Sequence, residues 1–178
     1  MIEKTISSKI HFTGKIFQVE VQQIELEPGT RATREIVRHS PAVAVMAHLA
    51  GKGFVLVRQY RKPVEAEVLE IVAGLVEPGE ALEDCARREV REETGYDVRS
   101  MVELGEMWPS AGYCDERLHM YFAEVEDNGR GQQPDEDERV VPVILTVEQL
   151  RQTIAAGEIR DAKTMAAWCL WNERIRGK

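Results

Sequence analysis

Residues 74–96 read GLVEPGEALEDCARREVREETGY, and this stretch decides the fold. Successive side chains on a helix are separated by about 100°, so four residues of the stretch form one apolar face: Leu82, Cys85, Ala86 and Val90. Glu89 and Glu93 fall in the middle of that same face. Burying two like charges side by side is costly unless a cation neutralises them. The stretch therefore predicts a helix from about Glu80 to Thr94, ended by Gly95, that carries a site for a divalent metal.

The segments before this helix are predicted to be strands. Alternating residues 10–26 and 32–39, joined by a turn at residues 27–29, predict a small N-terminal antiparallel sheet. Residues 41–49 and 54–61 predict a hairpin of buried strands, and 68–72 a further strand.

The segments after it mix strands and helices. Strands are expected at residues 101–108, 118–125 and 139–145, with an acidic surface loop at 127–137. Helices are expected at about 147–156 and 161–176, the second with an apolar face of Met165, Trp168, Cys169 and Ile175. This order predicts an α/β fold, with helices packed on a mixed sheet. Residues 1–40 are predicted to form a separate β-sheet region, too small to be stable alone, and residues 41–178 the main domain.

Composition excludes several classes of partner. The 178 residues include 31 acidic and 23 basic side chains, a net charge of −8, which argues against nucleic-acid binding through a basic surface. No stretch approaches the roughly 20 apolar residues of a membrane span, so we expect no membrane partner and a cytoplasmic location. The three cysteines, Cys85, Cys114 and Cys169, lack metal-binding spacing and are expected to be free thiols.

The opening stretch also resembles a known family motif. Read as G-x5-E-x7-R-E-U-x-E-E-x-G-U, where U is a bulky aliphatic residue, it is similar to the complete box of the Nudix hydrolases. The matching polar positions and glycines are Gly74, Glu80, Arg88, Glu89, Glu92, Glu93 and Gly95. Tyr96 departs from the usual aliphatic residue. The resemblance implies an α/β/α sandwich.

The resemblance also implies a metal site. Glu89 and Glu93 would be the principal ligands, with Glu92 close by and the backbone carbonyl of Ala73 completing the cluster. The expected cofactor is Mg²⁺, with Mn²⁺ as the alternative, at two or three ions per site. In the family the arginine at position 88 orients a glutamate, and its spacing also predicts an i,i+4 ion pair with Glu92.

Glu80 has two interpretations. A carboxylate at the start of a helix is favourable against the helix dipole, so Glu80 either caps the helix or takes a peripheral part in metal binding.

An acidic run before the last strand supplies the expected base. Residues 134–138 read PDEDE, which on composition alone is typical of a solvated loop. ADP-ribose hydrolases of the family often carry Glu-x-Glu here, which would make Glu136 the general base and Glu138 a further metal ligand. Asp137, or a shift by one position, is the alternative.

Two arginines precede the box. Arg58 and Arg61 in the RQYR segment could pair with surface acids, but a planar guanidinium also suits phosphate oxygens. The segment is similar to that of ADP-sugar hydrolases, in which the second arginine contacts phosphates, so Arg61 is the stronger candidate for substrate binding and Arg58 the second. The segment LEIVAGLVEPGE also matches that subgroup, with Val72 where proline is common.

Further matches lie outside the box. Ser110-Ala111-Gly112 followed by Asp115-Glu116 is similar to the SPG and DE elements of the family, and GEIRDAKT at residues 157–164 resembles its G-x-I-x-D-x-K-T segment. Glu116 would contact the terminal ribose of the substrate, although a salt bridge with Arg117 or another neighbour explains it equally well. The aromatic residue that stacks on adenine is left open among Phe17, Trp108 and Tyr113.

The implied activity is metal-dependent hydrolysis of ADP-ribose to AMP and ribose 5-phosphate, on a small-molecule nucleoside diphosphate derivative. Another nucleotide sugar, a dinucleotide or an oxidised nucleotide is the nearest alternative, and a sensing module that binds without cleaving is a more distant one. The resemblance also implies a homodimer formed through the N-terminal region.

Overall fold

The computed structural model describes residues 2–133 and 139–176. The chain divides into two compact units. The first comprises Met1–Pro41 and Met107–Leu118, and the second comprises Ala42–Glu106 and His119–Lys178.

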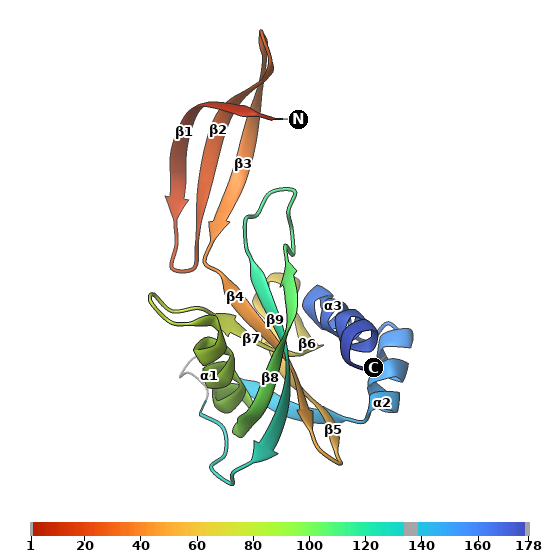
Figure 1. The fold of residues 1–178 in the computed structure, drawn as a ribbon. Coiled ribbons are helices and arrows are strands. Elements are labelled where there is room, and N and C mark those ends of the chain that lie inside the picture. The colour runs from red at the N-terminus through yellow and green to blue at the C-terminus, as the bar shows by residue number, and fades with distance from the viewer. Residues whose placement is uncertain (1, 134–138, 177–178) are drawn as a thin grey trace. The chain divides into compact units, whose positions relative to one another are not determined.

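The first unit is built on a three-stranded antiparallel sheet, drawn in red to orange in Figure 1. Its strands are β1 (Lys4–Thr13), β2 (Phe17–Glu27) and β3 (Thr30–His39). The predicted turn between β2 and β3 is confirmed, with Gly29 at φ +86°, a conformation that favours glycine. Strand β1 begins six residues before the predicted start at Ile10, because its polar residues hide the alternation that marks a strand.

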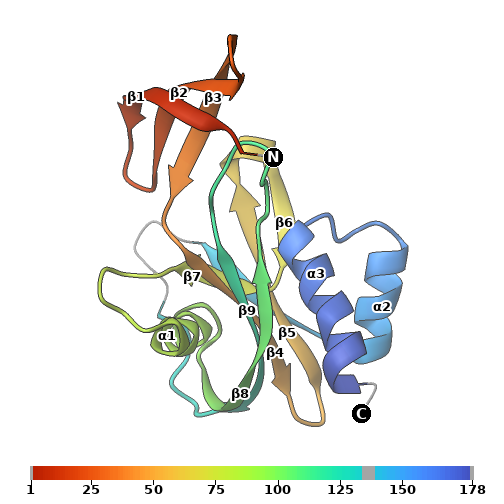
Figure 2. The same cartoon turned by 45° about the horizontal axis from the view of Figure 1, so that its top comes forward.

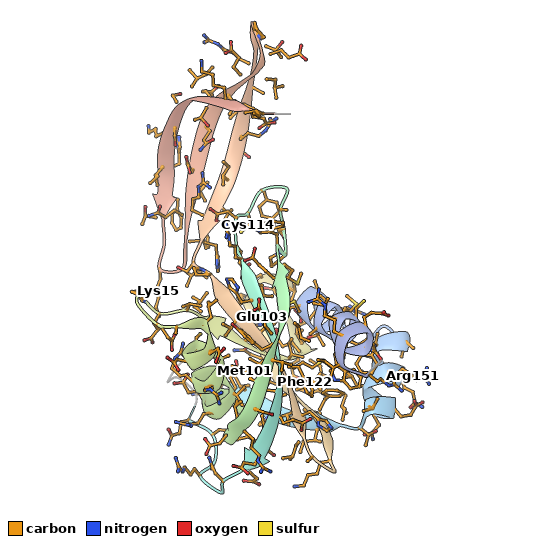
Figure 3. All side chains as sticks on the ribbon, viewed as in Figure 1. Lys15, Met101, Glu103, Cys114, Phe122 and Arg151 are labelled. Carbon is orange, nitrogen blue, oxygen red and sulfur yellow. The ribbon has the colours of Figure 1, made fainter. Side chains whose placement is uncertain are left out.

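The sheet of the first unit has little core of its own. In its three strands only Ile24 is buried, and side chains project from both faces (Figure 3). The backbone of Val37 in β3 pairs with the loop at residues 107–118, donating to Tyr113 at 2.7 Å and accepting from Asp115 at 3.1 Å. The first unit therefore contains a second segment besides the predicted region 1–40.

The second unit is organised around a seven-stranded mixed sheet. The strand order is β10-β5-β4-β9-β8, with β6 paired to β5 and β7 paired to β4. The strands are β4 (Ala42–Leu49), β5 (Gly53–Arg61), β6 (Ala66–Glu70), β7 (Val72–Leu75), β8 (Tyr96–Met107), β9 (Leu118–Asp127) and β10 (Val140–Leu145). A short 3-10 helix, η1 (Lys62–Val64), follows β5.

Helices cover both faces of this sheet, as Figure 2 shows. On one face α1 (Leu82–Thr94) packs on a core that includes Val55 and Val90. On the other face lie α2 (Val147–Ala155) and α3 (Ala162–Trp171), where Phe54 meets Trp171 with ring centroids 4.8 Å apart. Phe122, labelled in Figure 3, approaches Trp171 on the same side. Neighbouring residues of β5 thus point to opposite layers, and the predicted α/β/α sandwich is confirmed.

The predicted apolar face of the last helix is only partly confirmed. Trp168 and Ile175 are partly buried, and Trp168 packs on Phe54 with ring centroids 6.1 Å apart. Met165 and Cys169 are exposed, whereas Thr164, Ala167 and Trp171 are buried. The inward face includes a polar residue, because the buried Thr164 hydroxyl accepts a hydrogen bond from the backbone N–H of Ile71. The positions of apolar residues alone therefore did not identify the buried side of this helix. A short π-helix, η2 (Asn172–Arg176), continues α3.

Two smaller observations concern the cysteines and membrane spans. Cys85, Cys114 and Cys169 are free thiols. Among the residues that the structure describes, no helix is long and apolar enough to cross a membrane.

Candidate active site

The predicted box helix forms, with its glutamates inward. Helix α1 buries Cys85, Ala86 and Val90 as expected, and with them Glu89 (9% exposed) and Glu93 (3% exposed). Gly95 ends the helix at φ +78°, and its N–H bonds the carbonyl of Arg91 at 2.8 Å. The carboxylates that the sequence placed on an apolar face are therefore buried against the core.

Glu80 lies just before the helix, where the N-cap is Ala81 without a side-chain cap. Its carboxylate accepts the backbone N–H of Glu77 at 3.0 Å, and its own N–H donates to the carbonyl of Glu77 at 3.0 Å. The expectation that Glu80 caps the helix is therefore wrong. Glu80 closes the loop before α1 and faces Arg88 instead.

Arg88 is the centre of the site's ionic network. Its Nε and Nη2 atoms donate to the two oxygens of Glu80 at 2.8 and 2.9 Å. Nη1 donates to Glu89 at 2.7 Å and to Glu92 at 3.0 Å, so the predicted i,i+4 pair is present. Nη2 also reaches the carbonyl of Leu75, the last residue of β7, at 3.1 Å. The Arg88 guanidinium thus connects the loop before α1, the helix α1 and the strand β7.

This network shifts the pKa of its members. The hydrogen bonds from Arg88 lower the pKa of the Glu80 carboxyl to about 2. In return, the bond to Glu80 raises the pKa of the Arg88 guanidinium, and the charge of Glu89 adds to that rise. Burial raises the pKa of the nearby Cys85 thiol to about 12, which makes it an unreactive core residue.

Gly74 makes room for the Glu89 carboxylate. A Cβ atom on Gly74 would lie 1.9 Å from the carboxylate carbon of Glu89, far inside contact distance. The carboxylate therefore lies directly on the backbone of β7, next to Ala73. This close approach explains why the box needs glycine at this position.

The residues present fit a divalent cation. Buried carboxylates on α1 face a strand backbone, and carboxylate and carbonyl oxygens are the ligands that Mg²⁺ prefers. Within residues 2–133 and 139–176, no group of three or more His, Cys, Asp or Glu side chains forms a ready-made metal cluster. The predicted set of Ala73, Glu89, Glu93 and Glu138 includes a backbone carbonyl and a residue outside those ranges.

Arg61, at the end of β5, lies in a second ionic network. Its Nε donates to Glu70 at 2.7 Å. Burial lowers the pKa of Arg61, but the bond to Glu70 and the charges of Glu70, Glu93 and Asp161 outweigh it and raise that pKa. Arg61 is thus electrostatically coupled to Glu93 of the box helix. It lines a cavity of about 750 Å³ together with Glu70, Asp161 and Lys163.

The other predicted site residues are placed as follows. Arg58 is exposed on β5, and strand alternation points it to the face opposite Arg61. Glu116 belongs to the first unit, where it lies 3.9 Å from the ring of His39. The candidates for adenine stacking, Phe17, Trp108 and Tyr113, belong to the same unit. Glu136 and Glu138, with the alternative Asp137, lie outside the described residues. The roles of all these residues stay predictions.

Sequence reasoning assigned no role to Glu70 or Lys163. Glu70 lies between Leu69 and Ile71 in an apolar run, and a carboxylate in such a run is a sequence signal for a buried and paired charge. Lys163 belongs to the GEIRDAKT segment, which was noted only as a match to the family.

Comparison with known proteins fits this geometry. The model of the NUDIX domain matches residues 38–168, which include β4 to β10 and the box helix. The chain belongs to the NUDIX family. Proteins of this family are generally dependent on divalent metals, in agreement with the donor set on α1.

Two relatives match this chain over most of its length. The ADP-ribose pyrophosphatase of Bacillus subtilis (strain 168) is 39% identical over 168 residues, covering 93% of this chain and 90% of the relative. The GDP-mannose pyrophosphatase of Shigella flexneri is 34% identical over 152 residues, covering 76% and 79%. A crystal structure of an ADP compounds hydrolase has a TM-score of 0.88 at 21% identity, covering 99% of this chain and 96% of that one, and this likeness supports the fold.

Proposed function

We propose that this NUDIX protein hydrolyses the diphosphate bond of ADP-ribose and releases AMP and ribose 5-phosphate. The observation that carries the proposal is the Glu89 carboxylate, which is buried against Gly74 and held by Arg88 and so offers a fixed oxygen ligand to a divalent cation. The relationship to an ADP-ribose pyrophosphatase at 39% identity supports the choice of substrate.

The proposed roles follow from the chemistry of each side chain. Bound Mg²⁺ or Mn²⁺, at two or three ions, supplies charge neutralisation at the diphosphate and makes a water more acidic. Glu89, Glu93, Glu138 and the carbonyl of Ala73 would hold the ions. Arg88 fixes Glu89 and Glu92 in place.

The chain would then direct the attack of water. Arg61 would hold phosphate oxygens, with Arg58 as the second cationic candidate, and Glu116 would contact the terminal ribose. Glu136 would take the proton of a water as it attacks phosphorus, while the bridging P–O bond breaks toward the leaving phosphate. General-base help of this kind typically contributes about 10² to 10⁴ in rate.

A substrate panel tests the proposal. ADP-ribose, GDP-mannose, other nucleotide sugars and dinucleotides would each be incubated with the protein and Mg²⁺, and the products separated by chromatography. Release of AMP from ADP-ribose at the highest kcat/KM supports the proposal. Preference for GDP-mannose would favour the chemistry of the other relative, and binding of ADP-ribose without any product would favour a sensing module.

Glu93→Gln tests the metal site itself. We expect this change to abolish Mg²⁺-dependent turnover, because the neutral amide is a poor ligand for a hard cation. Glu83→Gln, on the exposed face of the same helix, is the matched control and should retain activity. Full turnover by Glu93→Gln would show that the box does not hold the metal.

We also propose a homodimer formed through the N-terminal sheet. Ile6, Ile10 and Phe12 of β1 are between 44% and 52% exposed, and apolar side chains open to solvent suit contact with a partner. Removal of residues 1–40 should abolish both dimerisation and activity, and Ile10→Asp should weaken the dimer where Ser7→Asp does not. A fully active monomer in light scattering would contradict this proposal.

The proposed location is the cytoplasm, and the proposed partner is a small molecule, with neither nucleic acid nor membrane involved. The three free thiols fit a reducing compartment, and the net charge of −8 disfavours nucleic acid. Cell fractionation and a DNA-binding assay at low salt test these two points.

A further inference from the structure

Glu70, the last residue of β6, is a buried carboxylate that binds two cations. Only 1% of the residue is exposed. Its Oε1 accepts from Nε of Arg61 at 2.7 Å, and its Oε2 accepts from Nζ of Lys163 on α3. A buried carboxylate is costly without such partners. Glu70 and its two partners, which we call the Glu70 junction, connect β5, β6 and α3.

The junction extends into the start of α3. Lys163 also donates to Asp161 at 3.0 Å, and Asp161 caps the helix by accepting the N–H of Thr164 at 2.9 Å. The hydroxyl of Thr164 in turn accepts the backbone N–H of Ile71 at 3.0 Å. The first turn of α3 therefore binds Glu70 and Ile71, the two residues immediately before strand β7.

This arrangement leaves the phosphate-binding edge of Arg61 available. Glu70 takes only the Nε group, and within residues 2–133 and 139–176 neither Nη group of Arg61 makes a hydrogen bond. A guanidinium held at Nε has its rotation restricted while its outer N–H groups can still bind an anion.

Lys163 affects the charge around Arg61 as well as the position of Glu70. Without it, the full negative charge of Glu70 would act on Arg61 and weaken its attraction for phosphate. With it, the charge of Glu70 is shared between two cations.

We propose that Glu70 and Lys163 are positioning residues that orient Arg61 and keep its positive charge available to the substrate diphosphate. This inference rests on the proposed function only in naming a diphosphate as the ligand of Arg61. Asp161 and Thr164 connect this junction to the strand that carries Ala73.

The test is a double-mutant cycle on ligand binding. The variants are Glu70→Gln, Arg61→Met and the pair, and the probe is α,β-methylene ADP with Mg²⁺, whose bridging carbon cannot be hydrolysed. Calorimetry measures the dissociation constant, and thermal melting checks that each variant folds. Glu83→Gln, at an exposed glutamate of α1 that does not line the cavity of Arg61, is the control.

Glu70→Gln should weaken binding of the probe by about tenfold, since charge-assisted hydrogen bonds typically contribute that much. The same change should have less than about a twofold effect in the Arg61→Met background, because the group it orients is then absent. An equal loss in both backgrounds, or no loss in either, would overturn the inference.

Lys163 gives a second test if Glu70→Gln does not fold. Lys163→Met should weaken binding of the probe, Lys163→Arg should restore most of it, and Lys52→Met in the exposed β4–β5 turn should have no effect. Failure of Lys163→Arg to restore binding would also count against the inference. These measurements need no turnover, so a protein that binds the probe but cleaves no ADP-ribose would refute the proposed function and leave this test intact.

Discussion

Gly74→Ala is expected to push the Glu89 carboxylate off the backbone of β7. The new Cβ would lie 1.9 Å from the carboxylate carbon, so one of the two groups must move by about 1.5 Å to restore ordinary contact. Gly74 has no positive φ, so alanine adds no backbone strain and the effect is steric alone.

The size of that displacement decides the effect on activity. Metal–ligand distances tolerate only about 0.2 Å, so a shift of about 1.5 Å removes Glu89 from any productive position. Misplacement by about 1 Å can cost a hundredfold in rate. We therefore expect kcat/KM to fall by at least about a hundredfold and the Mg²⁺ concentration for half-maximal rate to rise. Overpacking should also lower the free energy of unfolding by about 1–3 kcal/mol.

Steady-state kinetics across a Mg²⁺ titration and urea denaturation measure the two effects. Gly112→Ala is the control for stability, because a Cβ there meets nothing within 4 Å. Glu89→Ala removes the clashing group, so adding Gly74→Ala to Glu89→Ala should cause little further destabilisation. An equal loss of stability from Gly74→Ala with and without Glu89 would refute the steric argument.

Three further predictions concern the same site. Arg88→Lys should lower the melting temperature and kcat together, because one ammonium cannot reproduce the fork that bonds Glu80, Glu89 and Glu92; an unchanged melting curve would contradict this. Because the pKa of Glu80 is lowered to about 2, its contribution to stability is present above the ordinary value of 4.5 and is lost as pH falls from there toward 2. Acid titration of Glu80→Gln should therefore show a smaller loss of stability over that range, and an identical profile would count against the pair. Glu136→Gln should lower kcat without changing the Mg²⁺ requirement, whereas Glu138→Gln should raise that requirement; the reverse pattern in a Mg²⁺ titration would exchange the two roles.

The box helix could be predicted because its signals are local. Apolar spacing, the inward Glu89 and Glu93 and the terminal Gly95 all lie within one segment, and the structure places each as the sequence indicates. The hairpin of β4 and β5 was equally accessible, since β4 and the first half of β5 are mostly apolar and are joined by a turn that contains Gly51. Local pattern thus accounts for the layer that carries the proposed metal ligands.

Pairings between distant segments could not be predicted. Lys163 and Glu70 are 93 residues apart, and no periodicity relates them. The inward face of α3 was partly misjudged for the same reason, because the buried Thr164 bonds the distant backbone of Ile71. Polar side chains that are satisfied across the fold resemble surface residues until their partners are known.

The two ionic networks of the second unit have different net charges, and this difference indicates where a metal ion is needed. In the first network the two carboxylates of Glu70 and Asp161 meet the two cations of Arg61 and Lys163, so this network is neutral and needs no further ion. Around Arg88 one guanidinium meets the carboxylates of Glu80, Glu89 and Glu92, which leaves a net charge of −2 when all three are ionised. Glu93, buried on the same helix face, adds to that excess. Negative charge of this size, partly removed from water, is stabilised by additional cations, so a divalent ion is expected at α1 and not at the start of α3.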